Sequence, residues 1–358
     1  MYILQMMAAL QVFEEPDVLE DAAGERVRLP RRIVKDRLDL FLTLTEEEFT
    51  SRFRISKQSA RALLADLHLP EAADARGCPV PPHLQLLITL RWMATGDLHQ
   101  TIGDCLDVSQ QFVSSCSSRT VRAIAALYQQ YVKFPGRHEL GSIKTHFEAI
   151  SGFPGVIGAI DCTHIPILNP GGQQAETYQS RKGFFSLNVQ AVCGPDLTFY
   201  NIICRWPGSV HDSRIFANSS LYAQLQAGDY NGHLLGDSAS PIHPFLMTPV
   251  GNPSRPNEGR YNLAHAKTHN VIERAFGVWK RLFRCLAIPM RTSLDTTIAT
   301  ICSAAVLHNI ALADRNEDME DYDNDIINEE ERLIENAQNR HAGQRKRANM
   351  INNVFSNE

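Results

Sequence analysis

Three acidic residues in the middle third of the chain have the types and settings that metal-dependent phosphate chemistry needs. Asp161 and Asp237 each end a short apolar run bordered by glycine, and Glu273 lies within a strongly periodic helical stretch. Carboxylates at two strand ends and on a following helix can converge on a hard divalent cation. Mg²⁺ prefers oxygen ligands and keeps open positions for phosphate oxygens, and Mn²⁺ is its usual substitute. These residues therefore predict a divalent-metal site with Asp161, Asp237 and Glu273 as its catalytic carboxylates.

Each of these residues also has a plain structural interpretation. An Asp at a strand end often does no more than start a turn. A helical Glu is usually exposed to solvent, and a helical wheel places Glu273 with His269 and Lys280, away from the apolar face of the helix. One such residue would mean little, whereas three in this order favour the metal site.

Other polar residues near these carboxylates leave two alternatives open. Asp212 follows an expected strand, and it either adds a further metal ligand or caps the helix that begins at Ser213. Arg181 and Lys182 precede another strand, and Lys280 lies two turns after Glu273. These cations can contact DNA phosphates, or they can form a solvated basic face.

The surrounding pattern predicts the elements that position the carboxylates. Short apolar runs predict strands over 156–160, 184–193, 197–206 and 233–236, and helical spacing predicts helices over 213–225, 262–283 and 297–313. The segment 239–262 is rich in Pro, Gly and Asn, which predicts a loop. This order is typical of an α/β fold, an RNase H-like mixed sheet flanked by helices.

The region 45–150 is predicted to be all-helical. Thr45 and Glu48 form a capping-box signature at its start, and residues 98–126 follow a helix-turn-helix pattern. The second helix of that pattern, expected over 110–127, presents four polar residues that can contact DNA: Gln110, Gln111, Ser114 and Arg119. Three packed helices with a polar solvent face would give the same pattern.

Bulk composition fits a globular protein with several structural units. The 358 residues carry a net charge of −5, but 314–331 holds ten acidic residues and one basic residue, so the rest of the chain is mildly basic. Eight cysteines without metal-ligand spacing favour reduced thiols in an intracellular protein. No stretch is expected to reach the length of a transmembrane helix. The predicted units are an arm or loose helix over 1–44, the helical region 45–150, a nuclease-like domain over 151–313, and an acidic tail with a basic cluster at Arg345-Lys346-Arg347 over 314–358.

Several ordered motifs give the chain a specific family resemblance. They are Gly158-Ala159-Ile160-Asp161-Cys162-Thr163-His164-Ile165, Tyr178-Gln179-Ser180-Arg181-Lys182-Gly183, Trp206-Pro207-Gly208-Ser209-Val210-His211-Asp212-Ser213, Leu235-Gly236-Asp237-Ser238, Tyr261-Asn262-Leu263-Ala264-His265, Val271-Ile272-Glu273-Arg274-Ala275-Phe276-Gly277 and Leu307-His308-Asn309. Over about residues 85–312 the chain resembles the PIF/Harbinger transposases and the nuclease derived from them. Cys162 stands where the transposases often have Gly, and Ala239-Ser240 stands where they often have Gly-Tyr. Neither change removes a carboxylate.

The resemblance implies a DDE nuclease domain that cuts phosphodiester bonds in DNA with two metal ions, and that can also transfer strands through a 3′-hydroxyl. It implies Asp161, Asp237 and Glu273 as the metal-site carboxylates, with Asp212 as a fourth position. It further implies a nuclear protein with a cytoplasmic pool that binds double-stranded DNA, such as element terminal repeats, together with a Myb-like partner protein. A homo-oligomer is compatible with this picture. The alternative is a domesticated DNA- or protein-binding factor without catalytic activity.

Overall fold

The N-terminal unit is a small antiparallel ladder where it is described. The computed structural model describes residues 18–20, 26–28, 39–70, 80–172, 175–315 and 338–354. Residues 1–39 form one unit, in which β1 (Val18–Glu20) pairs with β2 (Arg26–Arg28), and residues 40–358 form another. The described part of the first unit is therefore not the expected loose helix. Most of the acidic run 314–331 lies outside the described residues.

Eight helices precede the large sheet in the described part of the second unit: α2 (Leu40–Thr43), α3 (Glu46–Phe53), α4 (Lys57–Leu67), α5 (Pro82–Thr95), α6 (His99–Leu106), α7 (Gln110–Ala126), α8 (Tyr128–Tyr131) and α9 (Leu140–Ser151). The expected capping box is present at α3, where Thr45 and Glu48 exchange hydrogen bonds. Helices α6 and α7 fall where the helix-turn-helix pattern placed them, and Ser109 caps α7 through its hydroxyl. The all-helical N-terminal region is thus confirmed.

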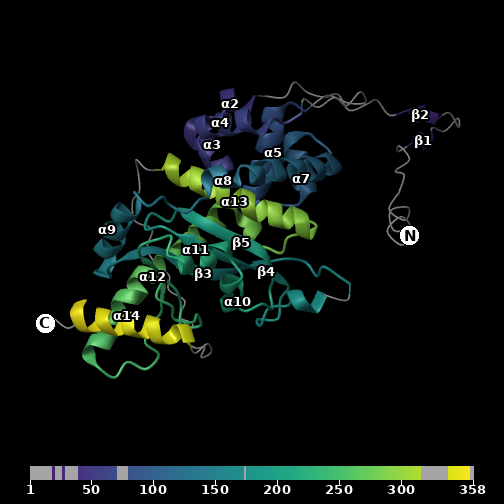
Figure 1. Ribbon diagram of the computed structural model, residues 1–358. Helices are drawn as coiled ribbons and strands as arrows, with labels where there is room; N and C mark the ends of the chain where they lie inside the picture. Colours follow the sequence, from purple (N-terminus) through teal and green to yellow (C-terminus); the bar gives the residue numbers. More distant parts are fainter. Residues whose placement is uncertain are drawn as a thin grey trace. The chain divides into compact units, whose positions relative to one another are not determined.

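Five strands form a mixed sheet in the order β5-β4-β3-β6-β7. They are β3 (Val156–Pro166), β4 (Ser186–Cys193), β5 (Phe199–Pro207), β6 (His233–Leu235) and β7 (Leu246–Met247). Strands β3, β4 and β5 pair antiparallel, whereas β6 joins β3 in parallel and β7 joins β6 in parallel. This topology confirms the expected RNase H-like fold (Figure 1).

Two apolar cores cover the two faces of the sheet. Ala159 and Ile165 of β3 pack in the core shared with α12 (Pro256–Leu282) and α13 (Leu294–Asp314). Ile160 packs in a second core with Phe216 of α10 (Asp212–Ala217) and Leu221 of α11 (Ser220–Ala227). Because side chains alternate along a strand, each face of β3 meets a different helical layer.

Three predicted segments differ from the structure. Strand β3 continues to Pro166, whereas it was expected to end at Ile160, so Asp161 lies within the strand and not at its end. The single helix expected over 213–225 is divided into α10 and α11, because Ser219 starts a new helix by accepting a hydrogen bond from the Tyr222 N–H. The loop expected over 239–262 contains β7 and the first turns of α12, which begins at Pro256. Proline suits the first turn of a helix because its missing N–H has no helical partner to lose.

Helix α13 is a core element of the second unit. Its 21 residues are long and apolar enough to cross a membrane, so the expectation that no stretch reaches this length was wrong. However, 72% of its apolar window is buried inside the protein. This burial is typical of a core helix.

The C-terminal basic cluster lies on a docked helix. Helix α14 (Gln338–Val354) packs beside α12 and β7 (Figure 1), and Ile351 is buried there. Lys346 donates a hydrogen bond to the Pro244 carbonyl at 2.8 Å, and Arg347 donates to the Pro249 carbonyl at 2.9 Å. At least two of the three basic residues expected in the tail are therefore engaged within the fold.

Candidate active site

The pairing of β3 with β6 brings Asp161, within β3, beside Asp237, which follows the end of β6. Ala159 is in register with Leu235, and each Asp lies two residues further along its parallel strand or the segment that follows it. Neighbouring strands are about 4.8 Å apart, so the two carboxylates leave the sheet side by side. The Cys162 N–H donates to Asp161 Oδ1 at 2.7 Å, and the Ser240 hydroxyl donates to Asp237 Oδ1 at 2.8 Å.

Two contacts between α12 and β3 fix the position of Glu273. His269 Nε2 donates to the Ile160 carbonyl at 3.1 Å, and further along the helix Lys280 Nζ donates to Thr163 Oγ1 at 2.7 Å. Glu273 lies about 6 Å along the helix axis beyond His269, since an α-helix rises about 1.5 Å per residue. It therefore lies between the two contacts, near the level of Asp161, and it is exposed.

Asp212 approaches from the opposite face of the sheet. It is the first residue of α10, whose N-cap is His211, so the alternative that Asp212 caps this helix is wrong. Asn188 of β4 donates to Asp212 Oδ1 at 2.7 Å and to the Val210 carbonyl at 2.8 Å. Asn188 thus holds the Asp212 carboxylate at the end of the sheet.

The four carboxylates act on one another electrostatically. The pKa of Asp161 is raised well above its ordinary value, first by burial and then by the negative charges of Asp237, Asp212 and Glu273. The pKa of the Cys162 thiol is raised by burial and by Asp212 and Asp161. Negative charge is therefore concentrated beside the middle of β3, where β6 ends.

This donor set fits a hard divalent cation by its chemistry. Carboxylate oxygens that repel one another are the ligands that Mg²⁺ and Mn²⁺ prefer, and a bound cation would remove the repulsion. Across the described ranges, no three Asp, Glu, His or Cys side chains are already arranged to hold one ion.

Positive charge borders the carboxylates along α12 and the turn before β4. Arg181 and Lys182 are exposed in the tight turn 180–184, in which Gly183 adopts a φ of 85°. Burial, with the charge of Lys182 as a smaller cause, lowers the pKa of Lys280 to about 8. Burial also lowers the pKa of His164, which meets the Ser186 hydroxyl at 3.0 Å. These groups can meet the phosphates of a bound polyanion.

The four residues expected to contact DNA from the helical region all lie on α7. Gln110, Gln111 and Ser114 are exposed near its N-terminal end. Arg119 is also exposed, but its guanidinium donates to Gln85 Oε1 of α5 at 2.9 Å. The second half of α7 packs against α13. The polar residues near the N-terminal end of α7 are therefore open to a partner.

Two residues that position the site were not identified from the sequence. Asn188 is a polar residue within the buried run of β4, and that burial is the signal that it has a specific partner. His269 was noted only as a neighbour of Glu273 on the helical wheel. In the structure it is buried, and it joins α12 to the last residue of β3 before Asp161.

Comparisons with known proteins agree with this geometry. A family model described as a DDE superfamily endonuclease matches residues 160–309. The human protein HARBI1, whose name calls it a candidate nuclease, is 35% identical over 278 residues, which cover 75% of this chain and 78% of that protein. The protein of the same name in Xenopus laevis is 30% identical over 259 residues, covering 71% of this chain and 72% of that protein. An ALP1-like protein of Arabidopsis thaliana is 29% identical over 299 residues, covering 76% and 71%. No solved structure matches the chain at a significant level.

Proposed function

Since the chain belongs to the Harbinger transposase-derived nuclease family, we propose that it is a divalent-metal-dependent DNA endonuclease. One observation carries the proposal. The in-register pairing of β3 with β6, together with the contacts of α12 on β3, brings Asp161, Asp237 and Glu273 together where β6 ends beside the middle of β3. Side chains from three separate segments, 112 residues apart at the extremes of the sequence, thus meet where phosphate chemistry would take place.

In the proposed reaction Asp161, Asp237 and Glu273 hold the divalent cations, and Asp212 is the fourth position from the other face. When bound, such ions activate the attacking water or 3′-hydroxyl and stabilise negative charge on the scissile phosphate. Lys280, Arg181 and Lys182 bind the flanking phosphates and orient the DNA. The hydrogen bond from Ser240 holds the Asp237 carboxylate, as that from Asn188 holds Asp212. Strand transfer would use the same groups with a DNA hydroxyl in place of water.

Glu273→Gln and Asp237→Asn are expected to lower cleavage of a labelled duplex in Mg²⁺ or Mn²⁺ by about a thousandfold, because each removes about 4 kcal/mol of transition-state stabilisation. The matched control is Glu148→Gln, which neutralises an exposed acid on α9. It should cut like the wild-type protein. Cleavage is measured by resolving labelled products on a denaturing gel.

A folded wild-type protein that cuts no DNA, even with terminal-repeat DNA and a Myb-like partner present, would overturn the nuclease proposal. The catalytically silent binding factor would then be favoured. The same proposal includes a Myb-like partner protein and a nuclear location with a cytoplasmic pool. It also includes DNA contacts made by four residues of α7: Gln110, Gln111, Ser114 and Arg119. They are supported by the family resemblance and by the open N-terminal part of α7.

The affinity for DNA is expected to fall as the pH rises through about 8. The Lys280 ammonium has a folded pKa of about 8, so its charge is present below that pH and lost above it. Losing one charge-assisted phosphate contact costs about 1.5 kcal/mol, roughly a tenfold change in affinity. The decline should disappear in Lys280→Met, which binds weakly throughout, and in Lys280→Arg, which keeps its charge. Fluorescence anisotropy of labelled DNA in metal-free buffer, from pH 7 to about 9.5, measures this affinity. An equal decline in the wild-type protein and both variants would show that a group other than Lys280 causes it.

A further inference from the structure

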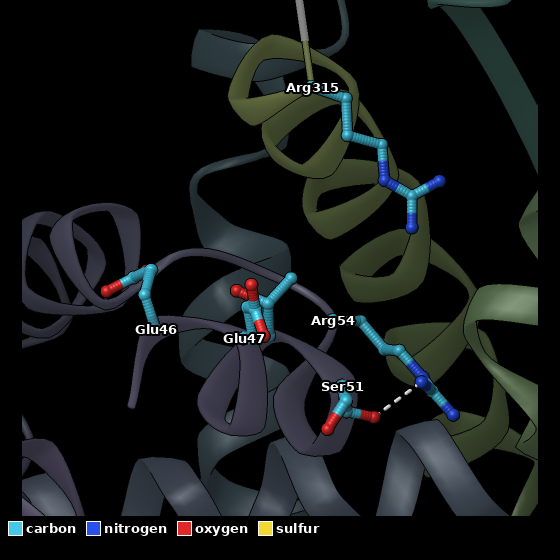
Figure 2. A pocket seen from close by; sticks show the side chains of 6 residues that line it. Glu46, Glu47, Ser51, Arg54 and Arg315 are labelled. Carbon is cyan, nitrogen blue, oxygen red and sulfur yellow. Dashed lines mark hydrogen bonds between the residues drawn. The ribbon is translucent and has the colours of Figure 1, made fainter. Parts of the chain in front are cut away.

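Two arginines of the second unit, Arg54 and Arg315, line a pocket that is remote in sequence from the carboxylates, and the charge of Arg91 on α5 acts on Arg54. The pocket has a volume of about 430 Å³, and Arg54, Ser51, Thr50, Glu46, Glu47 and Arg315 line it. Arg54 follows α3, and Arg315 follows α13. Figure 2 shows the guanidinium groups of Arg54 and Arg315 on the same side of the pocket, while Glu46 points away on the far side.

Among the described residues, no acid forms an ion pair with the arginines of this cluster, Arg54, Arg91 and Arg315. Burial lowers the pKa of Arg54, and the charges of Arg91 on α5 and of Arg315 lower it further. Grouped like charges are unfavourable unless an anion joins them.

Arg54 is also held in a way that folding alone does not require. Its φ of 72° lies in the left-handed region, where a helix ends most easily with glycine. Its Nε is buried without a hydrogen-bond partner. One end of its guanidinium donates to the Ser51 carbonyl, as the dashed line in Figure 2 shows. A strained arginine with an unused buried donor is a mark of a binding function.

The acids at the pocket do not occupy the cluster. Glu46 accepts a hydrogen bond from the Lys57 N–H at 2.7 Å, and it lies with Glu47 in the first turn of α3, where acids favour the helix dipole. In the described part of the chain, no hydrogen bond engages the Arg315 guanidinium or Nη2 of Arg54, so these groups can bind an oxyanion from outside. Planar guanidinium groups match the geometry of phosphate oxygens.

We infer that Arg54 and Arg315 form a second DNA contact, which binds a backbone phosphate away from the catalytic carboxylates. The inference rests on the proposed function, because DNA is the polyanion that the proposed reaction supplies. This contact does not depend on the base sequence of the DNA. It holds the duplex on the helical region while the carboxylate site cleaves at another phosphate.

The test is binding of a labelled random-sequence duplex by the full chain in EDTA at several salt concentrations. Arg54→Gly removes the guanidinium and suits the left-handed backbone, so it should fold at least as well as the wild-type protein. Arg54→Gly and Arg315→Gln are each expected to weaken binding about five- to tenfold and to reduce the salt slope by about 0.9. Arg137→Gln is the matched control: it removes an exposed arginine beside Asp229 and should bind like the wild-type protein.

Unchanged affinity and salt slope in Arg54→Gly and Arg315→Gln would overturn the inference. So would loss of binding to a polyglutamate peptide with duplex binding intact, because the cluster would then serve an acidic protein segment. Binding in EDTA does not depend on cleavage. A wild-type protein that never cuts but loses DNA affinity in both variants would leave this contact standing and remove the nuclease. A wild-type protein that cuts DNA, together with unchanged DNA affinity in both variants, would support the nuclease and overturn this contact.

Discussion

Asp161→Asn is expected to lower DNA cleavage by about a thousandfold or more while raising the melting temperature in metal-free buffer. The loss follows from the place of Asp161 among the carboxylates that would hold the cations. The gain in stability follows from the same place, because the ionised side chain is surrounded by other acids. Few substitutions in a folded protein are expected to act in opposite directions on stability and activity in this way.

The sign of the stability change follows from the direction of the pKa shift. The folded pKa of Asp161 is raised above its unfolded value, so its contribution to stability is full below the unfolded pKa and is lost as the pH rises through the folded pKa. At any pH above the unfolded pKa, this carboxyl group therefore opposes folding. An amide in its place removes the charge, and its oxygen can still accept the hydrogen bond from the Cys162 N–H.

Magnesium should reverse the order of stability. A cation that binds only the folded wild-type protein raises its melting temperature, and Asp161→Asn loses most of that increment. Thermal unfolding with and without Mg²⁺, beside the cleavage assay, measures both effects. Asp104→Asn on α6 is the control for removing an exposed acid, and neither effect is expected there. An equal Mg²⁺ increment in wild-type protein and Asp161→Asn would show that Asp161 is not a ligand.

Sequence pattern was sufficient for the elements that carry this site. Val156–Ile160 and the residues after Phe184 have the apolar character of buried strands, and the later helix has a clear 3.6-residue period. The order of these elements along the chain, and the carboxylates that they carry, were therefore predictable. Strand β7 has only two residues and lies in a segment rich in Pro and Gly. So short a strand exists because β6 offers it an edge, which no local pattern reveals.

Tertiary contacts account for the other differences. Asp212 follows a strand and precedes a helix, so the sequence could not exclude a capping role; Asn188, distant in sequence, provides its hydrogen bond. The stretch that forms α14 is largely polar. It docks through Lys346 and Arg347, which donate to backbone carbonyls near β7, and through the single buried side chain of Ile351. A basic cluster in a polar stretch gives no sign of such partners.

The motif Leu307-His308-Asn309 was identified only by resemblance, and the structure gives it a role in stability. Asn309 lies buried on α13 and makes three backbone hydrogen bonds, all at 2.9 Å. Its Oδ1 accepts from the Phe199 N–H, and its Nδ2 donates to the carbonyls of Phe199 and Tyr131. One side chain thereby joins α13 to the start of β5 and to α8. His308 adds a contact to the Leu197 carbonyl at 3.0 Å.

Asn309→Ala is therefore expected to destabilise the protein by about 3–5 kcal/mol, because it leaves three backbone groups without partners at about 1–3 kcal/mol each, partly offset by water. At about 2–4 °C per kcal/mol, the melting temperature should fall by roughly 10 °C. Asn201→Ala is the matched control, since Asn201 is a half-exposed residue of β5. Its effect should stay within about 1 kcal/mol.

The same variant separates stability from catalysis. Asn309 has no hydrogen bond to the carboxylates or to Lys280, so cleavage by Asn309→Ala well below its melting temperature should match the wild-type protein. Thermal unfolding followed by circular dichroism, with cleavage assayed at low temperature, measures both properties. Equal losses of stability in Asn309→Ala and Asn201→Ala would contradict this role. Activity lost at low temperature with the fold intact would instead place Asn309 in the catalytic machinery, through the strand β5 that it holds.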